Sequence, residues 1–265
     1  MLSNLLTFIF FIVVGLEIRE GLSKPKEVLL PALCALGGMV VPALIFIAFH
    51  THTDLWAVAM PTDVALAIGA LIFLGKRVNP SVRLFLLTLA VADDLFSLLV
   101  IAIFFRSQLH LSSAIYTLGA ALIGAILPWR LVLIRYLSPV ITFVVIPLYI
   151  VINLLAHLNF SLAFTKVSVA LVIARIVGKV CGIFIVAAFL TRLTSMRLHE
   201  ALTLKEIAGV GLLAGMGMTV SLVISKITAT TAQELNQVRI GLFITALVSG
   251  LVGLIWLRAT SAQDS

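Results

Sequence analysis

Charged residues are scarce in this 265-residue chain, where Asp, Glu, Lys and Arg together make up only 11% of the sequence. An average soluble domain carries about 25% of these residues. Apolar side chains take their place and reach 62%, with a mean hydropathy of +1.23. The composition therefore excludes an ordinary soluble domain and predicts an all-α, polytopic membrane protein.

Cysteine is almost absent, and the only two, Cys34 and Cys181, both lie inside apolar segments. A buried thiol in such a segment behaves as a small apolar side chain, so neither a disulfide nor a metal pair is expected. The apolar start, 1–14, lacks the basic region and the small-residue cleavage site of a signal peptide. It therefore predicts a first membrane helix.

Hydropathy divides the chain into about nine transmembrane helices. The predicted spans are 3–18, 28–49, 56–75, 83–105, 111–128, 139–157, 166–191, 206–226 and 237–258. Nine alternating spans place twelve Lys and Arg residues on one side and four on the other, with Arg175 and Lys179 inside a span. The positive-inside rule makes the first side cytoplasmic, so the N-terminus is expected outside and the C-terminus in the cytoplasm.

Basic residues exceed acidic ones by 18 to 11, which gives a formal net charge of +7. The basic residues are spread over short cytoplasmic loops, without a basic run or interleaved aromatic residues. Nucleic-acid binding is therefore not expected.

Two adjacent carboxylates, Asp93 and Asp94, lie in the middle of the apolar run 84–105. An ionised Asp at the centre of a bilayer costs on the order of 3 kcal/mol, so the pair requires water, a cation or a partner. Adjacent residues of a helix point about 100° apart, so the two acids divide their tasks. We expect Asp94 to bind a hard cation and Asp93 to pair with Lys179, the ammonium near the centre of 166–191.

Two groups of three spans, 28–105 and 166–258, each have an interrupted middle member. The interruptions are Met60-Pro61-Thr62-Asp63 in the first group, and in the second Gly211, Gly215 and Gly217 leading into Met218-Thr219-Val220-Ser221. Corresponding spans are offset by five, an odd number, so the chain carries an inverted-topology repeat. Paired breaks expose backbone dipoles to an ion and are typical of transporters. For the glycines alone, close helix packing is an equally good explanation.

Three residues near the breaks leave alternatives open. Asp63 stands at the start of a half-helix, where its carboxylate either balances positive helix ends, which is the favoured explanation, or binds the ion. Thr62 is either an extra oxygen ligand or a cap. Arg175, one turn from Lys179, either extends toward the outer surface or serves the site.

Several motifs resemble those of the NhaA-type sodium/proton antiporters. The resemblance rests on 11–17, 61–69, 89–95, 178–179, 215–221 and 253–258. It implies an all-helical fold in which two triple-span repeats form the transport core and the other helices form an interface domain. It also implies that Asp94 is the main cation ligand, that Asp63 and Thr62 lie where two broken helices cross, and that Glu17 belongs to the pH response.

This resemblance suggests a division of the chain into five parts. They are an interface part with the first helix and a cytoplasmic loop (1–27), core repeat 1 (28–105), a reduced interface region (106–165), core repeat 2 (166–258) and a cytoplasmic tail (259–265). Against the family's twelve spans, the chain is expected to begin at the second span and to lack two more before the Pro139 span. These losses leave a homodimer open, and the stretch 133–139 lacks the Glu and His residues of the family's pH sensing.

The sequence thus predicts a secondary antiporter of a bacterial inner membrane that exchanges Na⁺ or Li⁺ for protons and contributes to sodium and pH homeostasis. Its partners are these ions and the lipid bilayer, without an organic cofactor. The alternative is a shortened relative that folds in the membrane as a structural or interaction protein without transporting. An enzyme is disfavoured, because no arrangement of nucleophile, base and oxyanion donors is evident.

Overall fold

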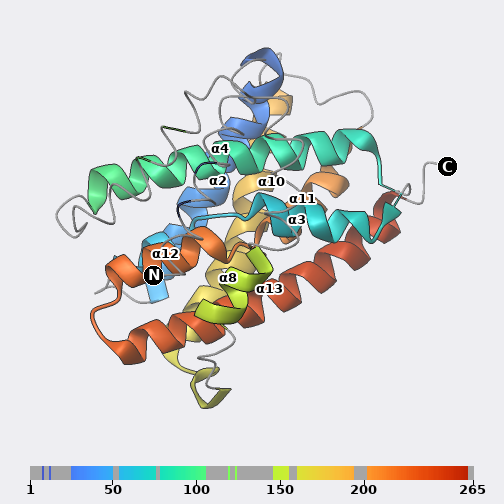
Figure 1. Ribbon diagram of the computed structural model, residues 1–265. Helices are drawn as coiled ribbons and strands as arrows, with labels where there is room; N and C mark the ends of the chain where they lie inside the picture. Colours follow the sequence, from blue (N-terminus) through green and yellow to red (C-terminus); the bar gives the residue numbers. More distant parts are fainter. Residues whose placement is uncertain are drawn as a thin grey trace.

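All regular structure in the described part of the chain is helical (Figure 1). The computed structural model describes residues 8, 12, 25–49, 54–75, 78–105, 119, 123, 146–154, 160–193 and 202–261. Within them, four continuous helical stretches are long and apolar enough to cross a membrane: Leu29–Phe49, Pro80–Phe104, Lys166–Leu193 and Ala232–Ser261. The predicted all-helical membrane fold is confirmed. Apart from residues 8, 12, 119 and 123, the predicted spans 3–18 and 111–128 lie outside the described residues, so the count of nine is not confirmed.

The first predicted repeat consists of α2, a broken segment and α4. After α2 (Pro25–Phe49), the broken segment begins as the 3-10 helix η1 (Asp54–Ala59) and ends as α3 (Val64–Ile72). Pro61 explains the interruption, because its ring removes a backbone donor and disfavours helical geometry in the preceding residue. The third member, α4 (Pro80–Phe104), begins after Asn79, whose side chain accepts a hydrogen bond from the backbone of Ser81 at 2.9 Å.

The second repeat has the same plan, with one difference in its first member. Here α9 (Lys166–Ile173) and α10 (Lys179–Leu193) are joined by a π-helical turn, η7 (Ala174–Gly178). The broken member consists of α11 (Leu204–Ala214) and α12 (Thr219–Thr228), whose axes differ by 50°. The third member, α13 (Ala232–Ser261), begins five residues before the predicted span. The side chain of Thr231 accepts a hydrogen bond from the backbone of Glu234 and extends the helix to that point.

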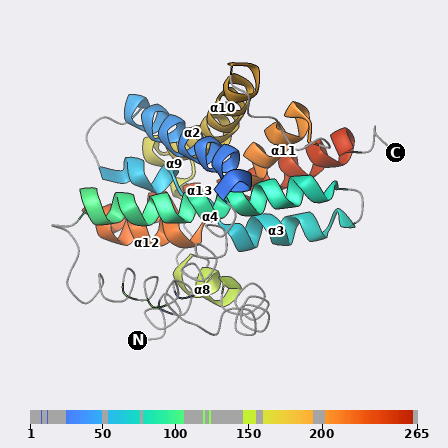
Figure 2. The ribbon, with the colours of Figure 1, turned by 90° about the horizontal axis from the view of Figure 1, so that it is seen from above.

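The two repeats interlock around their broken members. In Figure 1, α3 and α12 lie between α4 and α13, and Figure 2 shows the short α8 (Ile146–Asn153) on the side away from α2 and α10. The first half of each broken member contacts the second half of the other, η1 against α12 and α11 against α3. Such a reciprocal arrangement is expected of two repeats with opposite topology.

The first members of the two repeats, α2 and α10, touch at the level of their backbones. A Cβ atom added to Gly182 would collide with the carbonyl oxygen of Gly37. One added to Gly37 would lie 2.5 Å from the Gly182 oxygen and from Val186. Small residues allow this approach and let dispersion forces hold helices together in lipid, where hydrophobic burial adds little.

Buried apolar side chains form two clusters, and α4 contributes to both. Its first half packs Phe85, Leu86 and Leu89 into one cluster, and its second half packs Leu98 and Ile101 into the other. Asp93 and Asp94 lie on α4 between the residues of the two clusters, with 1% and 3% of their surface exposed. The packing therefore places the carboxylates in the protein interior between two apolar layers, away from the lipid-facing surface.

Gly182→Ala is expected to destabilise the protein by about 2 kcal/mol or more, because the added methyl group must push α2 and α10 apart. Gly69→Ala is the matched control, since a Cβ on Gly69 in α3 meets no atom within 4 Å. This control should be neutral or slightly stabilising, as alanine favours helices. Melting temperatures of the purified proteins in detergent test both, and equal values for the two variants would contradict the backbone contact.

Candidate functional site

The unwound parts of the two broken members, 60–63 and 215–218, pass each other at a point that we call the crossing. A Cβ atom on Gly217 would collide with the carbonyl oxygen of Pro61, and would lie 2.9 Å from the Thr62 Cα and 2.6 Å from the guanidinium of Arg175. Gly217 therefore fits both explanations given for the glycines. It allows two backbones to pack closely, and it leaves room for the guanidinium of Arg175 at the break.

Asp63 contacts the N-terminal ends of both half-helices beyond the crossing. Its carboxylate caps α3 by accepting from the backbone of Leu66 at 3.4 Å. It also accepts from Thr219, the first residue of α12, through the hydroxyl at 2.7 Å and the backbone N–H at 3.3 Å. Since helix N-termini carry partial positive charge, one buried carboxylate compensates two of them.

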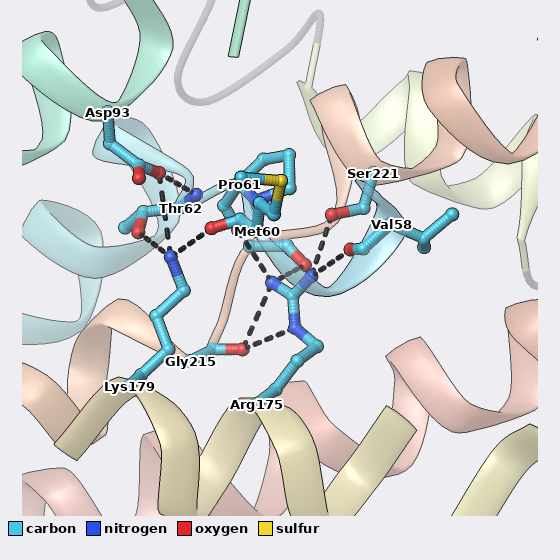
Figure 3. A network of polar contacts seen from close by, with 10 residues as sticks. Val58, Met60, Pro61, Thr62, Asp93, Arg175, Lys179, Gly215 and Ser221 are labelled. Carbon is cyan, nitrogen blue, oxygen red and sulfur yellow. Dashed lines mark hydrogen bonds and ion pairs between the residues drawn. The ribbon is translucent and has the colours of Figure 1, made fainter. Parts of the chain in front are cut away.

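Arg175 faces the opposite ends of the same segments (Figure 3). Its side chain is fully buried and donates six hydrogen bonds. The acceptors are the carbonyl oxygens of Val58 (2.8 Å), Pro61 (2.8 Å), Gly217 (2.6 Å) and Gly215 (twice, 3.3 Å), and the hydroxyl of Ser221 (2.7 Å). Carbonyl groups at the C-terminal end of a helix carry partial negative charge, so a cation belongs there. Arg175 therefore serves the crossing and does not extend to the surface.

Lys179 lies one turn beyond Arg175 and joins the crossing to α4 (Figure 3). Its ammonium donates to the Thr62 hydroxyl at 2.7 Å and to the carbonyl oxygen of Met60, and lies 3.6 Å from the Asp93 carboxylate. Both charged side chains are 1% exposed, and the predicted ion pair is present. The same Asp93 oxygen accepts from the backbone of Thr62, so Thr62 contacts both members of the pair.

The π-helical turn η7 carries Arg175 and ends directly before Lys179. Residues four apart share a helix face, which brings both cations to the crossing. Single π-helical turns inside α-helices are frequent at functional sites. The sequence pattern alone gives no signal for this turn.

α4 offers further oxygen atoms next to the ion pair. The second carboxylate oxygen of Asp93 and the hydroxyl of Ser97 are buried, without a hydrogen-bond partner among the described residues. Ser97 lies four residues after Asp93 and so on the same helix face. Oxygen atoms of this kind bind hard cations. Ser97 escaped the sequence analysis, because a single serine in an apolar helix carries no distinctive signal.

The remaining predictions concern residues away from the crossing. Glu17 lies outside the described residues. Cys34 and Cys181 are free thiols. Within the described ranges, no group of three or more His, Cys, Asp or Glu side chains forms a site for a resident metal ion.

Ionisable side chains of both signs are gathered at the crossing. Among the described residues, three acids, Asp63, Asp93 and Asp94, and two bases, Arg175 and Lys179, are buried there. With all five ionised, these described side chains together carry a charge of −1. Buried charge of this kind is costly, and it is a feature of sites that bind a cation or a proton.

Comparison with known proteins gives one consistent result. The family model described as Na⁺/H⁺ antiporter 1 matches residues 1–136 and 130–257. The chain is 29% identical over 318 residues to Na⁺/H⁺ antiporter NhaA 2 of Aliarcobacter butzleri. This alignment covers 95% of this chain and 80% of that protein. It is 30% identical over 317 residues to NhaA of Mannheimia succiniciproducens, and 31% over 326 residues to NhaA 1 of Magnetococcus marinus. Both of these alignments cover 96% of this chain and 82% of the relative.

Thr219→Val should destabilise the protein by about 1.5 to 3 kcal/mol, because it removes a hydroxyl donor from the buried, ionised Asp63. Thr88→Val is the control, since the Thr88 hydroxyl donates to the carbonyl group of Leu84, four residues earlier in the same helix, and contacts no charged group among the described residues. Thermal unfolding in detergent measures both. A Thr219→Val protein as stable as Thr88→Val would show that the contact between Asp63 and α12 contributes little.

Proposed function

The chain belongs to the Na⁺/H⁺ antiporter family whose model it matches, and we propose that it exchanges Na⁺ or Li⁺ for protons across a bacterial cell membrane. The observation that carries the proposal is the charge of −1 that the five described side chains carry together at the crossing, with the Lys179 ammonium 3.6 Å from the Asp93 carboxylate. One monovalent cation or one proton neutralises it equally well. A site that binds either the cation or the proton, but not both at once, couples the movement of one ion to the opposite movement of the other.

Asp94 and Asp93 are the proposed cation ligands, with Ser97 as an added oxygen. In the state described here, the ammonium of Lys179 lies 3.6 Å from the Asp93 carboxylate. An arriving cation competes with this ammonium and with protons for the same carboxylate oxygens. A protonated carboxyl group has lost negative charge and one acceptor site, so cation binding and protonation exclude each other. No covalent step is involved.

Thr62 is proposed to control the exchange rather than to bind the cation. Its hydroxyl accepts from Lys179, while its backbone N–H donates to Asp93. When the cation replaces Lys179 at Asp93, the ammonium keeps its bonds to the Thr62 hydroxyl and the Met60 carbonyl. Thr62 thereby holds the lysine close enough to return after the cation leaves.

The repeats 28–105 and 166–258 are the proposed transport core, and 1–27 and 106–165 the proposed interface part. The alignments with the relatives are longer than the 265 residues of this chain, which supports a chain that is shorter than its relatives within the aligned part. The excess of basic residues on one side supports a C-terminus in the cytoplasm. A fluorescent protein fused there that failed to fluoresce would contradict this orientation.

The alternative, a relative that folds without transporting, is not favoured. The buried acids and bases among the described residues, with the ion pair of Asp93 and Lys179 and the contact of Asp63 with Thr219, support transport. A protein that only had to fold is often as stable or more stable with apolar side chains in place of buried charges.

Transport can be tested in everted membrane vesicles with an imposed proton gradient. Addition of Na⁺ or Li⁺ should dissipate the gradient, and Asp94→Asn should abolish this response, because an amide keeps the shape of the carboxylate but not its charge. Asp54→Asn is the matched control, since Asp54 lies exposed at the start of η1 and should leave the response unchanged.

Two outcomes would contradict the proposal. In one, the wild-type chain is inserted in the membrane at normal levels, yet the gradient does not respond to either cation at any pH. In the other, Asp94→Asn responds as the wild type does.

A further inference from the structure

Arg175 is the largest fully buried side chain among the described residues. An isolated buried cation is strongly unfavourable, so its retention calls for a physical reason. The proposed exchange uses Asp93, Asp94 and Lys179, and does not need a second cation. The contacts of Arg175 must therefore be compared with those of Lys179.

The two cations contact different parts of the crossing. Arg175 donates to Val58 and Pro61 of the first broken member, and to Gly215, Gly217 and Ser221 of the second. Among the described residues, the hydrogen bonds and the ion pair of Lys179 all go to the first repeat, at Met60, Thr62 and Asp93. Arg175 alone of the pair therefore connects both segments and compensates the negative ends of both.

The chemistry of the two side chains fits this division. A guanidinium keeps its charge and presents five donors in a rigid planar fork, which suits a fixed set of carbonyl acceptors. An ammonium is a compact charge on a flexible stem, and it changes partners easily. Figure 3 shows the fork of Arg175 among the carbonyl groups and the ammonium of Lys179 between the first break and Asp93.

Building on the antiport function above, we propose that Arg175 is a positioning residue that supplies the permanent charge compensation of the crossing. Lys179 is thereby released from that task and can leave Asp93 when a cation binds. The fixed positive charge of Arg175 also repels a transported Na⁺ or Li⁺ ion. It thereby lowers the affinity of Asp93 and Asp94 for that cation. The division of labour thus separates a structural cation from an exchangeable one.

This role predicts different effects for charge and for geometry. Arg175→Gln removes the charge, so Na⁺ and Li⁺ should bind more tightly, with an apparent KM about three- to ten-fold lower and a reduced maximal rate. Arg175→Lys keeps the charge but loses the fork, so KM should stay within about two-fold of the wild type while the melting temperature falls. A purely structural arginine would affect stability and maximal rate in both variants and leave KM unchanged.

Lys179→Gln provides the matched comparison, because the same replacement is made one turn away on the same helix face. It should lower the melting temperature less than Arg175→Gln does, since Arg175 still connects the two segments. The three variants and the wild type are purified, their melting temperatures are measured in detergent, and Na⁺-dependent proton flux is measured in proteoliposomes.

The outcomes separate this proposal from the transport function. Lys179→Gln melting at or below Arg175→Gln would overturn it, as would equal KM values for Arg175→Lys and Arg175→Gln. If Arg175→Gln fails to fold while Lys179→Gln folds, the division of labour is supported, and failure of both counts against it. A wild type without cation-dependent flux would refute antiport and leave the melting comparison standing as the test of Arg175.

Discussion

The structure depends on one constraint, which is that backbone groups exposed by a broken membrane helix must find partners inside the protein. Two breaks face each other here, and their four half-helix ends are compensated by two side chains of opposite charge. Asp63 contacts the N-terminal ends of α3 and α12, and Arg175 contacts the carbonyl groups of Val58 and Gly215, where η1 and α11 end. Each side chain reaches both repeats, so the crossing is held together by charge as well as by packing.

The same solution leaves room for function. With Asp63 and Arg175 engaged by the helix ends, Asp93, Asp94 and Lys179 remain as a second group of buried charged side chains, in which Lys179 lies 3.6 Å from Asp93. Two apolar clusters enclose this group along α4, which strengthens its electrostatic interactions. The glycine contacts between α2 and α10 bring the helix that carries both cations close enough to reach the crossing. The helix packing and the proposed exchange site therefore depend on the same set of buried charges.

The parts of this arrangement that could be predicted from the sequence are residues with a large energetic cost in a membrane helix. Acids at Asp93 and Asp94 and a base at Lys179 are so costly in apolar spans that their association is predictable, and Pro61 marks its break unambiguously. The role of Arg175 was not predictable from the sequence. A long basic side chain one turn from the centre of a span can also extend to the membrane surface and place its charge in water. The π-helical turn and Ser97 depend on tertiary contacts that no local pattern records.

The central claim is that a monovalent cation and protons compete for the carboxylates at the crossing. Proton release can be measured directly by adding Li⁺ or Na⁺ to the purified protein in weakly buffered detergent solution and recording the pH. The account predicts that cation binding releases protons from the wild-type protein, in an amount that saturates with cation concentration. Saturable cation binding without proton release at any starting pH would contradict it.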